Sequence, residues 1–235
     1  MKLFSTFIQI NLSKIILFIL IMVNIVTACF YFTDNDNSKF GLLMGGLAAS
    51  LFVAIIQFLF AWNEHLEIEA IKRLGVKRVL PHRDEEAFYR GLIKAAKNRI
   101  CVMGVTGVRF MRDFADSESG RSEKRVLIDA LKNNVEVQIL MPSIKHLKSG
   151  ERDMAKISKN LFSRVKKISQ KFSVRYFDHI PTHSIVIVDD LCLLGPVFPD
   201  VASKDTPCIL ISANSIYANP YTKYFDSEWN NAAIY

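Results

Sequence analysis

The chain is poor in the residues that build redox, metal and nucleotide sites. It has only four cysteines, Cys29, Cys101, Cys192 and Cys208, with no CxxC pair and no histidine at a ligand spacing beside them. It also lacks a Walker loop and the glycine fingerprint of dinucleotide-binding folds. We therefore expect free thiols, no bound metal and no cofactor.

Charged residues are scarce in the first quarter of the chain, where two long apolar runs cover residues 8–32 and 40–62. A helix rises about 1.5 Å per residue, so each run is long enough to cross a hydrocarbon core of ~30 Å. The sequence predicts a transmembrane helical hairpin over residues 1–63, a helical connector over residues 64–75 and a soluble domain over residues 76–235.

The distribution of basic residues predicts how the hairpin is oriented. The link over residues 33–39 carries two acids and one base, whereas Lys2 and Lys14 precede it and Lys72 and Arg73 follow the second run. Basic residues favour the cytoplasmic side, so both chain ends are predicted to be cytoplasmic in a multi-pass protein. Residues 14–29 also resemble a lipoprotein signal ending at Cys29, but the apolar residues that follow favour the hairpin.

Small residues recur every four positions in the second run, on two adjacent lines of the helix. They are Gly41, Gly45 and Ala49 on one line and Gly46, Ser50 and Ala54 on the other. Small side chains let a neighbouring helix approach closely. Two interpretations stay open: packing against the first run of the same chain, and self-association into a homo-oligomer.

The remaining chain alternates between strand and helix signals, with one hairpin late in the order. Strands are predicted over residues 76–80, 99–105, 135–141, 172–177, 182–188, 191–195 and 208–212. Helices are predicted from residue 84 onward and over residues 126–132, 151–170 and 217–234. This order predicts an α/β fold with a mixed sheet.

One segment concentrates positive charge. The formal net charge of the chain is +7, and nine basic residues lie between Lys145 and Lys171 against two acids. Apolar residues at helical spacing predict one buried stripe: Met154, Ile157, Leu161, Val165, Ile168 and Phe172. The basic face opposite holds Arg152, Lys156, Lys159, Arg164, Lys166, Lys167 and Lys171. It could be simply solvated, lie on the lipid bilayer, or contact nucleic acid.

The segment Thr182–Asp190 resembles the signature of the phospholipase D superfamily, which reads His, any residue, Lys, four residues, Asp. The resemblance covers residues 76–235 and implies a phospholipase D-like domain, with His183 at the nucleophile position and Asp190 at the aspartate position. Ile185 replaces the lysine, and Gly195-Pro196 replaces the following Gly-Ser. Because lysine neutralises charge on the phosphoryl oxygens, the motif is expected to be vestigial and the domain a pseudoenzyme.

The combination of two spans and a degenerate domain is similar to small effectors of bacterial anti-phage systems, including those paired with retrons. That resemblance implies a bacterial inner-membrane location and a role as a defence effector or toxin. It also implies a nucleoprotein partner, a reverse transcriptase with its small DNA, for which the basic helix is a candidate contact. Two alternatives stay open: a membrane-bound phosphodiesterase (nuclease or phospholipase) using His183, and a membrane scaffold.

Overall fold

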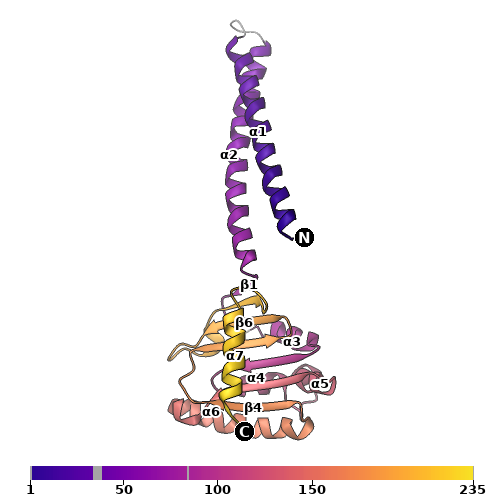
Figure 1. Cartoon of the computed structure of the whole chain (residues 1–235), viewed down its shortest axis with the longest axis vertical. Helices are drawn as coiled ribbons and strands as arrows, with labels where there is room; N and C mark the ends of the chain where they lie inside the picture. The colour runs from indigo at the N-terminus through magenta and orange to yellow at the C-terminus, as the bar shows by residue number, and fades with distance from the viewer. Residues whose placement is uncertain (1, 34–38, 84, 235) are drawn as a thin grey trace. The chain divides into compact units, whose positions relative to one another are not determined.

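The protein is described by a computed structural model covering residues 2–33, 39–83 and 85–234, with side chains described from Leu12 onward. The chain divides into two compact units, which meet in the sequence at Ile71 and Lys72 (Figure 1). The predicted polar link is described only at its ends, and Asp84, predicted to open a helix, lies outside the described residues.

The first unit is a pair of long helices, α1 (Lys2–Thr33) and α2 (Lys39–Arg73). Within them, Leu12–Thr33 and Lys39–Arg73 are long and apolar enough to cross a membrane. Only 6% of each apolar stretch is buried, so neither helix is the core of a soluble domain. The predicted connector is helical as far as Arg73, since α2 continues past the second apolar run without a break.

The two helices contact each other through part of the small-residue surface. Gly45 lies under the Tyr31 ring, where an added Cβ would come 2.8 Å from a ring carbon. Nearby, the Asn24 amide donates a 2.7 Å hydrogen bond to the Ala48 carbonyl, which satisfies a polar group that lipid would not. Gly45 is therefore used within the chain.

A neighbouring part of the small-residue surface remains open in the single chain. On the second line, a Cβ at Gly46 would meet nothing within 4 Å and Ser50 is exposed, and Ala49 of the first line is exposed beside them. The Ser50 hydroxyl donates to the Gly46 carbonyl of its own helix and so presents no unsatisfied donor. Self-association through this face stays a prediction.

The second unit is built on one mixed sheet. Among the described residues, eight strands form it in the order β1-β7-β6-β5-β2-β3-β4-β8. The strands are β1 (Val76–Leu80), β2 (Arg99–Met103), β3 (Glu136–Pro142), β4 (Phe172–Phe177), β5 (His183–Val188), β6 (Leu191–Pro196), β7 (Cys208–Ser212) and β8 (Ala233–Ile234). Strands β2, β3 and β4 run parallel, and the remaining pairings are antiparallel. The predicted α/β fold with a mixed sheet is confirmed.

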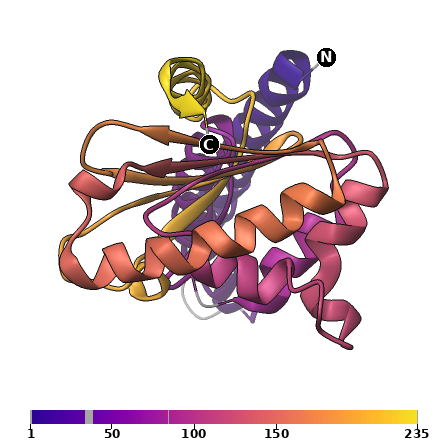
Figure 2. The same cartoon turned by 90° about the horizontal axis from the view of Figure 1, so that it is seen from below.

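Helices cover the two faces of the sheet unequally. One face packs against α3 (Glu86–Ala95), α4 (Val108–Phe114), α5 (Val126–Lys132) and α6 (Ser149–Ile168), whereas α7 (Asn219–Asn231) lies alone on the other (Figure 2). Single-turn helices η1 (Ser122–Arg125), η2 (Ile144–His146) and η3 (Ser203–Asp205) complete the loops. The apolar core is consequently split into two clusters, one on each side of the sheet.

The turn between β5 and β6 is fastened to the start of β2 by one carboxylate. Asp189 has a left-handed backbone with φ of +50°. Its carboxylate accepts hydrogen bonds from the backbone N–H groups of Lys97, Asn98 and Arg99, at 2.7, 2.9 and 2.9 Å. Burial acts to raise the pKa of this carboxyl, but the three donors outweigh it and hold the pKa below its ordinary value.

Replacing Asp189 tests this fastening. Asp189→Asn keeps a residue that tolerates the left-handed backbone but offers one acceptor oxygen in place of two. We expect the free energy of unfolding to fall by about 1–2 kcal/mol. Because the folded pKa is depressed, this stability is present above the unfolded carboxyl pKa of about 4 and lost as the pH falls through the folded value.

Thermal unfolding of the full chain in mild detergent, at pH 7 and at pH 3, measures both effects. Asp190→Asn is the matched control, because the neighbouring Asp190 is exposed and no side-chain contact is found for it among the described residues. Equal loss of stability in the two variants would contradict the role given to Asp189.

Candidate functional site

The residues of the phospholipase D-like motif begin at one edge of the sheet. β5 starts there at His183, which pairs with Pro196 at the end of β6. Strand β2 runs antiparallel to β5, so its carboxyl end at Met103 reaches the same edge opposite Ile185. Such edges of α/β sheets gather loops from several strands and are common ligand sites.

His183 faces the side of the sheet that α7 covers. Its Nδ1 lies 2.8 Å from the Thr182 hydroxyl, and its ring meets those of Tyr221 and Tyr224 edge to face, at centroid distances of 5.5 and 6.2 Å. The imidazole and Tyr221, with Tyr217, line a cavity of about 340 Å³. The contacts with Thr182 and the two tyrosines therefore fix the orientation of the imidazole, which also lines the cavity.

A short chain of polar side chains lies beside this histidine. The Tyr224 hydroxyl lies 3.4 Å from His179 Nε2, which in turn lies 3.1 Å from a Glu228 carboxylate oxygen. Burial, and then the Glu228 charge, raise the pKa of Tyr224, so its phenol stays neutral and can donate. Glu228 is 49 residues from His179 in the sequence and approaches it only through the packing of α7, so no sequence motif marks this pair.

Ile185, at the position of the missing lysine, is fully buried. It pairs with Met103 and Leu194 and belongs to the apolar cluster that includes Phe225 of α7. Among the described residues that line the cavity at His183, none is a lysine or an arginine. A phosphoryl group placed there would meet aromatic and apolar side chains, which cannot stabilise its charge.

Asp190 is not brought to this site. β5 separates it from His183 by roughly 17 Å at ~3.3 Å per residue. In that turn it is Asp189, not Asp190, whose carboxylate binds the backbone N–H groups at the start of β2. The motif spacing did not single out Asp189. The two consecutive aspartates are indistinguishable in the sequence, because only the backbone conformation decides which carboxylate meets the amides of β2.

The basic helix also differs from the prediction. α6 buries Ser158, Phe162 and Val165, whereas three residues of the predicted stripe, Met154, Ile157 and Ile168, are exposed. The stripe was right at Leu161, Val165 and Phe172, which lie in or against the core, and wrong at the other three, because Phe162 faces the core instead and lies 6.1 Å from the Phe172 ring.

Several bases of the predicted binding face have partners within the domain. Lys156 pairs with Asp153 at 3.1 Å and Arg164 with Glu118 at 3.0 Å. Arg152 and Lys171 donate to backbone carbonyls, and Lys171 lies beyond the end of α6. These pairs are exposed, so an incoming phosphate could exchange for either acid at small cost.

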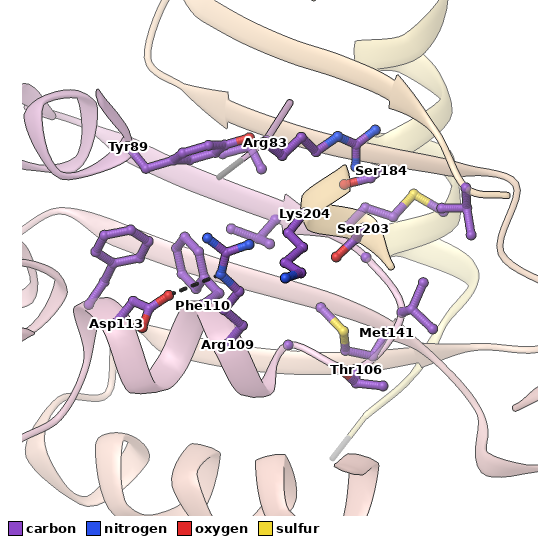
Figure 3. A pocket seen from close by; sticks show the side chains of 18 of the residues that line it. Arg83, Tyr89, Thr106, Arg109, Phe110, Asp113, Met141, Ser184, Ser203 and Lys204 are labelled. Carbon is purple, nitrogen blue, oxygen red and sulfur yellow. Dashed lines mark hydrogen bonds and ion pairs between the residues drawn. The ribbon is translucent and has the colours of Figure 1, made fainter. Parts of the chain in front are cut away.

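A second cavity lies at the same edge of the sheet, on the face that packs against α3, α4, α5 and α6, called the helical face below. Sequence reasoning missed it. It has a volume of about 150 Å³, and Arg83, Tyr89, Arg109, Ser184 and Lys204 are among its lining residues (Figure 3). These residues come from four segments that are distant in the sequence and carry no shared motif. Only the pairing of β1 with β7 brings the loops of Arg83 and Lys204 together.

No family model and no curated protein matches this sequence. Among solved structures, the chain is similar to TrmBL2, an archaeal chromatin protein described as showing a novel mode of DNA binding. The identity is 15% and the TM-score 0.45, over 82% of this chain and 70% of that one. It is also similar to Nuc from Salmonella typhimurium, a phospholipase D family member, with 15% identity and a TM-score of 0.44, over 67% of this chain and 96% of that one.

NucT from Helicobacter pylori matches with 12% identity and a TM-score of 0.42, over 67% of this chain and 96% of that one. At these identities and TM-scores the matches do not indicate an activity for this chain. What this chain does must be inferred from its own side chains.

The burial of Ile185 predicts that the lysine cannot be restored by one substitution. Ile185→Lys places an unpaired ammonium in an apolar cluster, and we expect the free energy of unfolding to fall by about 3 kcal/mol or more. Ile185→Val, which removes one methylene, should cost only about 1 kcal/mol. Thermal unfolding of the full chain in detergent compares the two, and a lysine variant that is as stable as the valine variant would contradict this account.

Proposed function

We propose that this chain is a membrane effector in which the α/β domain receives a signal or a partner and the hairpin acts on the bacterial inner membrane. The observation that carries the proposal is the buried Ile185, which occupies the position where a cation would brace a phosphate. A pocket without that cation favours recognition over phosphoryl transfer. The domain is then a pseudo-catalytic receiver, and its output is the hairpin.

The hairpin has features that suit an output element. Both helices are apolar over a membrane-spanning length, and the face formed by Gly46, Ala49 and Ser50 is open to another helix. In this proposal, copies of the chain associate through that face, with both chain ends in the cytoplasm, and disturb the bilayer. The link between the helices is then exposed on the outer side.

The proposed partner is a nucleoprotein complex of a defence system, a reverse transcriptase with its small DNA. The exposed bases of α6 support this choice, because a DNA backbone can replace weak surface pairs such as Lys156–Asp153. Lys167 adds positive charge near the end of the same helix. Phe162, the aromatic residue that lies among these bases in the sequence, is buried in the core, which favours backbone contacts over base stacking.

Membrane depolarisation is the direct test of the effector role. Induced expression in bacterial cells should lower the membrane potential, read with a potential-sensitive dye, before growth stops. Deleting residues 1–63 should abolish both effects. Gly46→Leu should weaken them, because a bulky side chain fills the open face, whereas Gly46→Ala keeps the face small and serves as the control. Growth arrest without depolarisation, or arrest that persists without the hairpin, would sink the proposal.

The alternative of a membrane-bound phosphodiesterase is favoured by one observation. His183 has its Nδ1 held by Thr182 and its ring at an open cavity, as a nucleophilic histidine requires. An enzyme of this kind would hydrolyse phosphodiesters in DNA or in lipid.

His183→Ala separates the two functions. The effector proposal expects no turnover of single-stranded DNA or phospholipid by the purified full chain, and unchanged depolarisation in cells expressing the variant. An enzyme would show turnover and lose it on substitution. His82→Ala, a histidine outside the motif, is the control. A pure scaffold would show neither turnover nor depolarisation.

A further inference from the structure

The cavity on the helical face contains an arginine in an unusual setting. Arg83 is only 8% exposed, yet its guanidinium pairs with no carboxylate among the described residues. One guanidinium nitrogen donates to the Pro196 carbonyl at 3.0 Å and approaches the Pro207 carbonyl at 3.5 Å, while Nε has no partner. A buried cation ordinarily requires a counter-charge.

The side chains closest to Arg83 do not supply that charge. Burial raises the pKa of the Cys208 thiol and of the Tyr89 phenol, so both are neutral at physiological pH. Burial also lowers the pKa of Arg83, but a guanidinium titrates so far above neutrality that it stays protonated. The site thus holds a fixed positive charge among neutral groups.

The absence of a side chain at Gly195 leaves the space that the Arg83 guanidinium occupies. The Arg83 guanidinium passes directly over Gly195, where an added Cβ would come 1.9 Å from one of its nitrogens. Any other residue at position 195 would displace the arginine. The glycine that stands near the expected Gly-Ser of the motif therefore makes room for a cation on the helical face.

A second cation accompanies the first. The Arg83 backbone N–H donates to the Lys204 carbonyl at 2.9 Å, which holds the two residues side by side. Lys204 extends into the middle of the ring of lining side chains (Figure 3). Lys204 is exposed to solvent but lines the same cavity as Arg83, so an anion between them would interact favourably with both charges.

The acids at the cavity are already engaged. Glu86 accepts from Arg90 at 2.5 Å, and Asp113 accepts from Arg109 at 3.3 Å. The Ser184, Ser203 and Thr106 hydroxyls add donors around the space that Lys204 enters. Cations and hydroxyl donors in this combination match the oxygens of a phosphate group.

We propose that this cavity binds a small phosphate monoester, with Arg83 and Lys204 as the charged contacts. The volume of about 150 Å³ is small beside the ~300–1,000 Å³ of pockets that enclose drug-sized ligands, so it accommodates the phosphate and little more. Phe110 and Val197 line the remaining wall and suit an apolar attachment. This site lies across the sheet from His183 and does not depend on the function proposed above.

Phosphate-dependent stabilisation of the full chain tests the site. In mild detergent at constant ionic strength, the unfolding midpoint should rise saturably with inorganic phosphate and not with chloride. Lys204→Ala should raise the phosphate concentration for half-maximal stabilisation about tenfold or more, because a charge-assisted contact is lost. Lys223→Ala removes the same charge from an exposed position on α7, across the sheet, and should match the unaltered protein.

Ser184→Ala provides a second variant in the cavity, and its half-maximal concentration should rise by a few fold. Glycerol 3-phosphate and adenosine monophosphate, titrated in the same way, distinguish a lipid-headgroup source from a nucleotide source, since the true class should bind more tightly than inorganic phosphate. Absence of saturable stabilisation, or an equal response of Lys204→Ala and Lys223→Ala, would overturn the proposal. None of these measurements depends on membrane depolarisation.

Discussion

The alternation of side chains along β5 is the constraint on which the chemistry of this domain depends. Residues His183, Ile185 and Ile187 point to the side that α7 covers, while Val186 and Val188 belong to the core on the helical side. A strand at the centre of a sheet cannot place neighbouring residues on one face. The histidine of the motif and Ile185, at the position of the lysine in the signature, must therefore share the α7 face, whereas Arg83 and Lys204 line the cavity across the sheet.

The packing of α7 decides what that face can do. Phe225 and Trp229 stack at 6.1 Å over the sheet, and Arg175 of β4 lies 4.7 Å from the Trp229 ring and donates to its carbonyl at 2.6 Å. Through these contacts α7 packs against the apolar cluster that contains Ile185. An ammonium there would lose its hydration without gaining a partner, so a stable α7 interface and a catalytic lysine exclude each other at this position.

Much of the fold follows from local sequence signals, and the exceptions have physical reasons. Strands β1, β4 and β7 have the predicted bounds, because turn residues or charges flank short apolar runs. Helix α4 was not predicted, since it is only seven residues long and starts after Gly107, whose left-handed φ of +68° hides the helix start. The strand predicted over residues 135–141 is β3, Glu136–Pro142, which includes the proline because a proline at the end of a strand lacks only one hydrogen-bond donor.

The candidate sites were less predictable than the fold, because their residues meet only through long-range pairing. His183 was found from the motif, but its partners Tyr221 and Tyr224 arrive with α7. Arg83 and Lys204 share no motif, and they become neighbours because β1 pairs with β7 at the far side of the sheet. A motif indicates chemistry from a short stretch of sequence. A buried cation without a counter-charge indicates instead what the folded chain can bind. Ile185 stands where the phospholipase D signature has lysine, so the buried Arg83 is the firmer starting point for proposing a ligand of this domain.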